Sequence, residues 1–170
     1  SSRLSLQCTR PNSVQQQPAP PTLTLLIQCS GGAHGLHGTV ESLRVSAANA
    51  DLQPAVLLLP WQLNKQGTEA LTAACASTTH VRWWVPPEPS ASEAESLALA
   101  SRQANTTWLW WLEAGDRLQP QALQQWRMAY GRHPDALLIA GDGEQLNSEG
   151  AVIRRHGAPA PTTRLRQLVQ

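Results

Sequence analysis

Short, uninterrupted apolar runs recur along this chain, and segments with helical character lie between them. The runs are Leu23–Cys29, Ala55–Leu59, His80–Val85, Trp108–Leu112 and Asp135–Ala140. A strand buried on both faces is a continuous apolar run, whereas a strand with one solvated face alternates. Strands that alternate with helices form right-handed βαβ units. The sequence therefore predicts a Rossmann-like three-layer α/β/α fold with a mainly parallel sheet.

The intervening segments predict helices over residues 36–48, 69–76, 92–104 and 121–130. Ser90 or Ser92 is suited to cap the third of these helices, and Pro120 is well placed in the first turn of the last. The strand at 55–59 is expected to stop at Pro60, and Pro86-Pro87 is expected to end the strand at 80–85. After Gly141 the alternation ends, and a turn at 147–150 followed by a short returning strand at 151–153 is predicted.

The domain boundaries follow from composition. Residues 1–21 are polar and end in a glutamine- and proline-rich stretch, which predicts a flexible lead-in. Residues 22–156 hold the alternating pattern and are expected to form one α/β domain with a full hydrophobic core. Residues 157–170 are too short to add a layer and are expected to form a tail.

Charge and cysteine usage exclude several classes of protein. The formal net charge is +1, Lys65 is the sole lysine, and the arginines are scattered, so no nucleic-acid partner is expected. Cys8, Cys29 and Cys75 lack metal-site spacing, which favours reduced cysteines in a cytoplasmic protein. The apolar runs fall far short of the roughly 20 residues that span a bilayer, so no transmembrane segment is expected, and no secretory signal is visible.

In open parallel sheets, ligands bind beyond the carboxyl ends of the strands. The loop at 112–117 follows a predicted strand and contains Glu113 and Asp116, two carboxylates three positions apart. Such a pair is suited to Mg²⁺ or Mn²⁺, with phosphate oxygens completing the shell. The alternative is that Asp116 caps the next helix and that Glu113 is merely solvated.

The segment from Asn105 to Gly150 resembles the centre of the family 2 glycosyltransferases, which have the GT-A fold. In that family a strand ends in an acidic motif, and a proline, a leucine-bearing helix, a His-Pro-like turn, a strand, a Gly-Asp pair and a final glycine turn follow. The matching residues here are Leu112–Asp116, Pro120, Leu123, His133-Pro134, Leu137–Ile139, Gly141-Asp142 and Glu149-Gly150. Leu25–Ser46 is similar to the first strand and helix of the family.

The resemblance implies a nucleotide-sugar-binding half of a GT-A enzyme that transfers a hexose to a hydroxyl acceptor on a glycan, lipid or protein. It assigns Asp116 and Glu113 to the metal, Mg²⁺ or Mn²⁺, and to the diphosphate. The chain departs from the family pattern at Gly115, which stands at the central aspartate position, and at Glu113, which is longer than aspartate.

Other residues of the candidate site come from the neighbouring loops. Ser30 and Gly31 follow the first strand, and Trp61 follows the second, where it could stack on a base or simply belong to the core or its rim. Asp142 could accept hydrogen bonds from sugar hydroxyls or belong to an ordinary turn. Arg102, in the helix before the fourth strand, is suited to approach a phosphate.

Two alternatives remain. Family members carry the acceptor site and the catalytic base in a following segment, so this chain could be a non-catalytic binding module. Alternatively, Gly32, Gly35 and Gly38 fit G-x-x-G-x-x-G and resemble the dinucleotide loop of short-chain dehydrogenases, which bind NAD(P). Against that class, no acidic residue closes the second strand and no Tyr-x-x-x-Lys occurs, and a glycine-rich turn that lets a helix pack closely is the simpler interpretation.

Large aromatic volume comes from tryptophan, because the chain has no phenylalanine. Trp108, Trp110 and Trp111 lie on the predicted fourth strand, with Trp108 and Trp110 on one face. We expect tryptophan to fill the large core positions.

Overall fold

The computed structural model describes residues 22–77, 81–84 and 92–157. The chain divides into two compact units, and each is described separately. The sheet unit comprises the described residues up to Ala33 together with those in Pro54–Glu113. The helix–hairpin unit comprises His34–Gln53 and the described residues from Ala114 onward.

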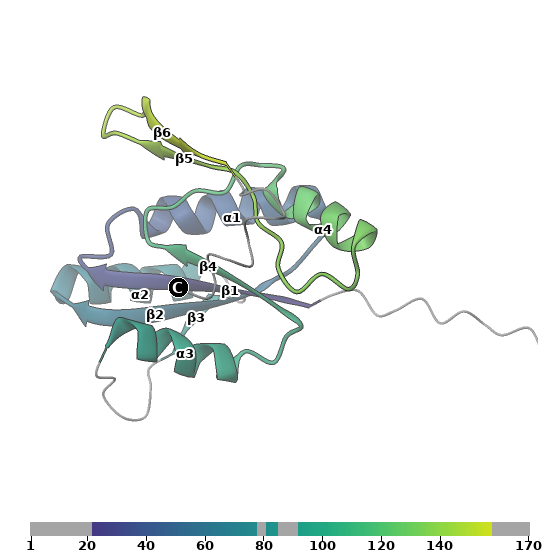
Figure 1. Ribbon diagram of the computed structural model, residues 1–170. Helices are drawn as coiled ribbons and strands as arrows, with labels where there is room; N and C mark the ends of the chain where they lie inside the picture. The colour runs from purple at the N-terminus through teal and green to yellow at the C-terminus, as the bar shows by residue number, and fades with distance from the viewer. Residues whose placement is uncertain (1–21, 78–80, 85–91, 158–170) are drawn as a thin grey trace, which may run out of the picture. The chain divides into compact units, whose positions relative to one another are not determined.

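The sheet unit contains a parallel four-stranded sheet with strand order β3-β2-β1-β4 (Figure 1). Its strands are β1 (Leu23–Gly31), β2 (Ala55–Leu63), β3 (Val81–Trp83) and β4 (Trp108–Glu113), and its helices are α2 (Lys65–Ser77) and α3 (Glu93–Gln103). The chain winds outward from β1 through β2 to β3 and then returns to place β4 on the other side of β1. The expected Rossmann-like α/β class is confirmed, and the direction of winding reverses between β1 and β4.

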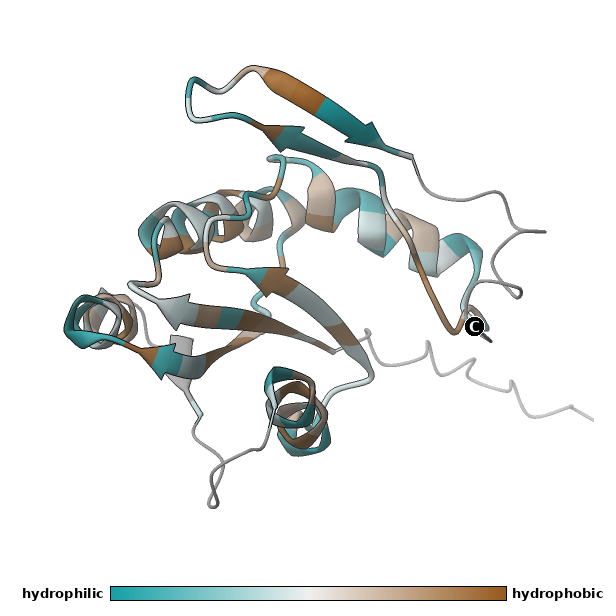
Figure 2. Ribbon diagram, turned by 60° about the vertical axis from the view of Figure 1, so that its left-hand side comes forward, coloured by the Kyte–Doolittle hydropathy of each residue, from teal (hydrophilic) through white to brown (hydrophobic). Residues whose placement is uncertain are grey.

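The core of the sheet unit is built from leucine. All of Leu23–Cys29 is buried, and so is Val56–Leu59, as continuous apolar strands predict. Figure 2 colours the strands and helices by hydropathy. Leu97 and Ala100 of α3 pack with Leu26 of β1 and with the leucines of β2. The inner strands therefore bury both faces, as a parallel sheet requires.

The expectation that tryptophan fills the core is wrong for β4. Trp111 is 51% exposed, and among the tryptophans whose burial is described only Trp126 is buried. The reason is topological: β4 pairs with β1 alone in the described sheet, and α3 packs against β1 and β2. Within the described part of the sheet unit, the face of β4 that carries Leu109 and Trp111 has no helix packed on it.

Several boundaries differ from the expectations. β2 continues through Pro60 to Leu63, because beyond Leu58 its registered partners lie only on β1, and proline is tolerated where one side of a strand is open. α2 begins earlier than predicted, since the Asn64 side chain accepts a hydrogen bond from the Gly67 N–H at 2.9 Å. β3 is shorter than predicted, and His80 and Pro86-Pro87 lie outside the described residues.

The cap of α3 is confirmed at Ser92, whose hydroxyl accepts a hydrogen bond from the Glu95 N–H at 3.2 Å. Glu93 and Glu95 lie in the first turn, where carboxylates favour the helix dipole. Ser90, the other candidate cap, lies outside the described residues, as do the predicted lead-in and all but the first residue of the predicted tail.

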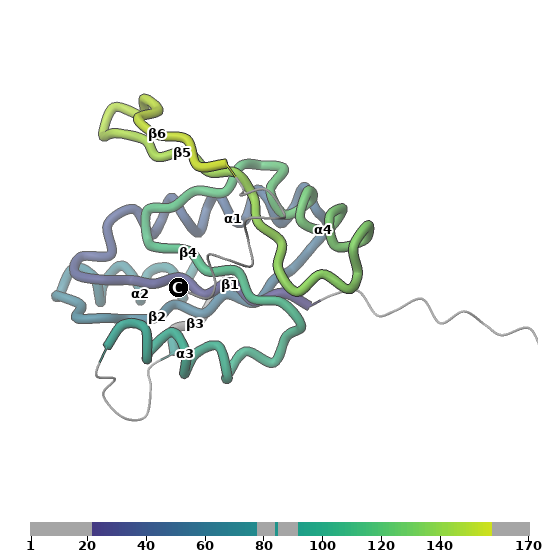
Figure 3. The backbone as a smooth tube through the Cα atoms, viewed as in Figure 1, coloured from purple at the N-terminus to yellow at the C-terminus, as the bar shows by residue number. Residues whose placement is uncertain are grey.

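The helix–hairpin unit contains α1 (Leu36–Ala50), α4 (Ala122–Arg132) and an antiparallel pair, β5 (Gly143–Leu146) and β6 (Val152–His156). Figure 3 traces the backbone through these elements. The predicted turn is confirmed: Asn147 accepts hydrogen bonds from the N–H groups of Glu149 and Ala151 through its side-chain oxygen. The returning strand is confirmed as β6, and β5 is its unpredicted partner.

The predicted strand over Asp135–Ala140 is wrong. No residue of this range is in a strand, and Leu137 is 99% exposed. A strand requires a partner for its backbone groups, and no described strand pairs with this segment. Its apolar composition alone was an insufficient signal.

Candidate functional site

In the sheet unit, the carboxyl ends of β1, β2 and β4 lie at one edge, next to the reversal of strand order. Ser30 of β1 is in register with Trp61 of β2, and Gln28 of β1 is in register with Glu113, the last residue of β4. Side chains of registered neighbours project from the same face of a sheet. Ser30, Gly31, Trp61 and Glu113 are therefore brought to one edge, where a parallel sheet binds its ligands.

Gln28 is the unusual residue of this edge. It is 3% exposed, and neither its amide oxygen nor its amide nitrogen has a hydrogen-bond partner among the described residues. Buried polar groups are normally paired, since an unpaired one costs about 1–3 kcal/mol. The sequence analysis missed Gln28 because it interrupts an otherwise apolar run without belonging to any motif.

Arg102 is not part of this edge. It lies in the last turn of α3, and a short connection leads from α3 to Trp108, which is in register with Leu23 at the beginning of β1 (Figure 3). The end of α3 is therefore close to the amino-terminal edge of the sheet, opposite Ser30 and Glu113.

In the helix–hairpin unit, the loop that carries Asp116 is attached to one face of α1 by side-chain hydroxyls. The Gly115 N–H donates to Thr39 Oγ1 at 2.9 Å, the Leu118 N–H to Ser42 Oγ at 3.1 Å, and the Leu123 N–H to Ser46 Oγ at 3.0 Å. We call Thr39, Ser42 and Ser46 the hydroxyl ladder. Helical spacing places all three on neighbouring turns of one face.

The position of Asp116 does not fit the expectation that this residue caps the following helix. α4 begins at Ala122 with Gln121 as its N-cap residue, and the Gln121 side chain makes no capping hydrogen bond. Ser46 of α1 accepts the free N–H of Leu123 instead. Asp116 is exposed in the preceding loop and is not the cap of this helix.

Close packing against backbone explains Gly35 in the first loop, whereas Gly38 of α1 lies next to the flexible end of a side chain. A Cβ atom on Gly35 would lie 2.7 Å from the Cα atom of Gly115, and one on Gly38 would lie 2.8 Å from the Arg117 guanidinium. Gly35 has φ +80°, a conformation that favours glycine. The Gly35 contact accounts for one of the three spaced glycines, in line with a glycine-rich turn that lets a helix pack closely.

The remaining acidic candidate lies elsewhere in the same unit. Asp142 is exposed and directly precedes β5, at the base of the hairpin and near Gly157. Across the described residues, no group of three or more His, Cys, Asp and Glu side chains is arranged to hold a metal ion. A metal at Glu113 or Asp116 would accordingly need phosphate or water oxygens in its shell.

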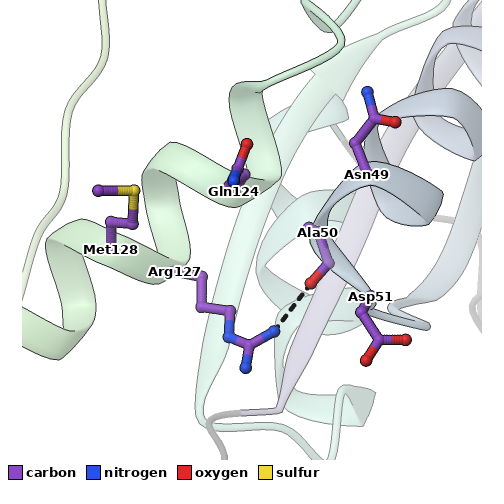
Figure 4. Close-up of a pocket in the computed structure, with 6 residues that line it drawn as sticks. All are labelled: Asn49, Ala50, Asp51, Gln124, Arg127 and Met128. Atoms are coloured by element: carbon purple, nitrogen blue, oxygen red, sulfur yellow. Dashed lines mark hydrogen bonds between the residues drawn. The ribbon is translucent and has the colours of Figure 1, made fainter.

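An open hollow of about 450 Å³ lies between the end of α1 and α4 (Figure 4). In it, Arg127 donates a hydrogen bond to the Ala50 carbonyl oxygen at 2.9 Å, and Asn49, Asp51, Gln124 and Met128 complete the lining. A cation at the last carbonyls of a helix is a capping interaction. None of the residues predicted for the site lines this hollow.

Burial controls the pKa of the Cys29 thiol in the sheet unit. Desolvation raises the pKa of Cys29 to about 12, and the neighbouring Cys75 adds to the increase. The Cys29 thiol donates to the Ile27 carbonyl oxygen at 3.5 Å. Cys29 is therefore a neutral core residue.

No helix in the described part of the chain is both long and apolar enough to cross a membrane.

Comparison with known proteins supports the fold. No protein-family profile and no curated protein sequence matches the chain. Among solved structures, two crystal structures of S. aureus TarS, a family 2 glycosyltransferase, are similar, each with a TM-score of 0.54 and 11% sequence identity over 66% of this chain. The match covers 33% of the TarS 1–349 chain and 20% of the other TarS chain, so this chain spans a third or less of either.

At this identity the likeness concerns the fold alone. The chain has a glycosyltransferase-like Rossmann fold of the GT-A type.

The hydroxyl ladder was not predicted from the sequence, although its signal, a Thr-x-x-Ser-x-x-x-Ser pattern on a predicted helix, is visible in Thr39–Ser46. Hydroxyls at helical spacing are also common on solvated faces, so the pattern alone predicts little.

Proposed function

We propose that this chain binds a nucleotide-diphosphate sugar and serves as a glycosyltransferase domain that transfers the sugar to a hydroxyl acceptor. The observation that carries the proposal is the end of β4 beside β1, at the reversal of strand order in a GT-A-like sheet. Glu113 stands at that end. Open α/β sheets bind their ligands at such a position.

In this proposal Glu113 and Asp116 hold Mg²⁺ or Mn²⁺ together with the diphosphate oxygens. The metal would neutralise the charge that develops on the leaving diphosphate. Ser30 and Gly31 at the end of β1, with the neighbouring Trp61, are suited to the nucleoside. Asp142 is suited to sugar hydroxyls. Arg102 has no role in the proposal, because it lies near the opposite edge of the sheet.

A dinucleotide-binding function is disfavoured by the close packing of Gly35 against the Gly115 backbone. A binding module without transfer activity is distinguished from an active domain by experiment. The hydroxyl acceptor would be a glycan, a lipid or a protein.

The binding experiment measures thermal stability of the full chain with UDP-glucose or GDP-mannose, each with and without Mn²⁺. A ligand that binds only the folded state raises the unfolding temperature. We expect a Mn²⁺-dependent increase for one of the two donors, and its loss in Asp116→Asn. Asp135→Asn, a matched change at another exposed loop aspartate of the same unit, should keep the increase.

NAD and NADP are measured in parallel. Stabilisation by a dinucleotide alone, or an increase that survives Asp116→Asn, would contradict the proposal. Release of nucleoside diphosphate from the donor, with and without hydroxyl acceptors, then separates an active domain from a binding module.

A further inference from the structure

The hydroxyl ladder holds the backbone around Asp116, although no sequence motif includes its residues. Each of its hydroxyls accepts a backbone N–H from the segment 115–123, at 2.9 to 3.1 Å. Thr39 is 1% exposed and Ser46 is fully buried. Two of these hydrogen bonds therefore fix the backbone of the acidic loop on one face of α1, and the third, to Ser46, holds the first turn of α4.

The hydroxyls of Thr39 and Ser42 are themselves oriented. Thr39 Oγ1 donates to the Gly35 carbonyl oxygen at 3.3 Å, and Ser42 Oγ donates to the Thr39 carbonyl oxygen at 2.8 Å. A hydroxyl has one donor and two acceptor lone pairs. Because the proton is directed back to the helix backbone, the lone pairs remain for the loop N–H groups.

The two anchored peptides bracket Asp116. Gly115 directly precedes it, and Leu118 follows it by two positions. We infer that the ladder orients the Asp116 carboxylate for the metal–diphosphate, with Thr39 as a positioning residue. The inference rests on the proposed function, since it names what prepares that site.

Preorganisation is the physical reason for such an arrangement. A metal or diphosphate site requires its side chains to be held within about 0.5 Å of the binding geometry. Asp116 lies on an exposed loop, and its backbone would otherwise have to be ordered at the moment of binding, which weakens affinity. Anchoring residues 115 and 118 on α1 removes most of that conformational freedom beforehand.

The test uses Thr39→Val, which keeps the branched shape and removes the acceptor, and Thr39→Ser, which restores the acceptor. Thr72→Val is the matched control, because the Thr72 hydroxyl donates only within α2, to the Thr68 carbonyl oxygen at 2.9 Å. Calorimetry measures the affinity for UDP with Mn²⁺. Amide exchange by NMR measures protection of the Gly115 N–H, and thermal unfolding without ligand measures stability.

We expect Thr39→Val to weaken the affinity for Mn²⁺-UDP by about five- to tenfold, as the loss of one hydrogen bond implies. Exchange of the Gly115 N–H should accelerate in the same variant. Thr39→Ser should recover both values, and Thr72→Val should leave them unchanged.

The outcomes separate the inference from the proposal on which it rests. If the unmodified chain binds neither UDP nor GDP with Mn²⁺, the proposed function fails and the positioning role fails with it. If the unmodified chain binds and Thr39→Val binds equally well, the inference alone is overturned, even where the unfolding temperature falls, because a merely structural hydroxyl would have that effect.

Discussion

The turn before α1 and the acidic loop meet through two glycines: a Cβ atom added to Gly35 would lie 2.7 Å from the Cα atom of Gly115. Both residues have positive φ, +80° for Gly35 and +111° for Gly115. Real Cβ atoms do not approach backbone this closely without a shift. The glycine at the central position of the acidic motif is therefore a backbone requirement of this chain.

Gly35→Ala is expected to lower the free energy of unfolding by about 1–3 kcal/mol, because alanine is strained at positive φ and its methyl group would displace Gly115. Urea denaturation measures the change. Gly131→Ala, in the last turn of α4 and facing open space, is the control and should be neutral or stabilising by up to about 1 kcal/mol. Equal effects at the two positions would refute the packing argument.

An aspartate at position 115, the central aspartate position of the family 2 glycosyltransferase pattern, should not improve metal binding. Gly115→Asp places a side chain at φ +111° and brings its Cβ atom within 3.4 Å of the His34 carbonyl oxygen. We expect a lower unfolding temperature and no gain in Mn²⁺ affinity, measured by calorimetry. A tighter Mn²⁺ complex with unchanged stability would show that the loop accommodates a third carboxylate.

Ser46 caps α4 from another helix. Ser46→Ala removes the acceptor for the Leu123 N–H in a fully buried position, so the free energy of unfolding should fall by about 0.5–2 kcal/mol. Ser101→Ala is the matched control, since that hydroxyl donates only to the Ala98 carbonyl oxygen within α3. Denaturation that finds no difference between the two variants would remove the capping role.

The strands of the sheet could be predicted because double-sided burial leaves a strong signal. Leu23–Cys29 and Trp108–Leu112 both appear inside observed strands, and the cap at Ser92 follows from local hydrogen bonding. Local chemistry did not reveal the end of β2, because tolerance of Pro60 depends on which neighbours β2 has. The false strand at 135–140 has the same cause: pairing is a property of the sheet and not of the segment.

Some residues of the candidate site could likewise be placed from the sequence, and others could not. Glu113 was placed correctly at a strand end, because strand and loop are adjacent in sequence. Arg102 and the hydroxyl ladder depend on contacts between distant segments, such as Thr39 with Gly115, and periodicity carries no information about these. The assignment of residues to metal, diphosphate and sugar stays a prediction.

Alkaline pH should destabilise the sheet unit through Cys29. Its folded pKa of about 12 lies above its ordinary value of 9.0, so the unfolded chain loses the proton first. The stabilisation that the protonated Cys29 thiol provides is complete below about pH 9 and is lost as the pH rises toward 12. Over that range the free energy of unfolding falls by at most about 1.4 kcal/mol per pH unit. Urea denaturation between pH 8 and pH 10.5, values chosen as roughly bracketing the ordinary pKa, should show a steeper loss for the unmodified chain than for Cys29→Val. Cys75→Ser should retain most of the loss, and identical slopes in all three proteins would contradict the burial effect.

Gln28 offers the opposite kind of test, a substitution expected to stabilise. Its two amide atoms are buried without partners in the described part of the chain, so Gln28→Leu removes the cost of desolvating them and completes the apolar strand. We expect the free energy of unfolding to rise by about 1–2 kcal/mol, the range for one unsatisfied polar group. Gln145→Leu, in the fully exposed strand β5, is the control and should have little effect. A decrease in stability for Gln28→Leu would mean that the amide is hydrogen-bonded in solution, with an internal water as the first candidate partner.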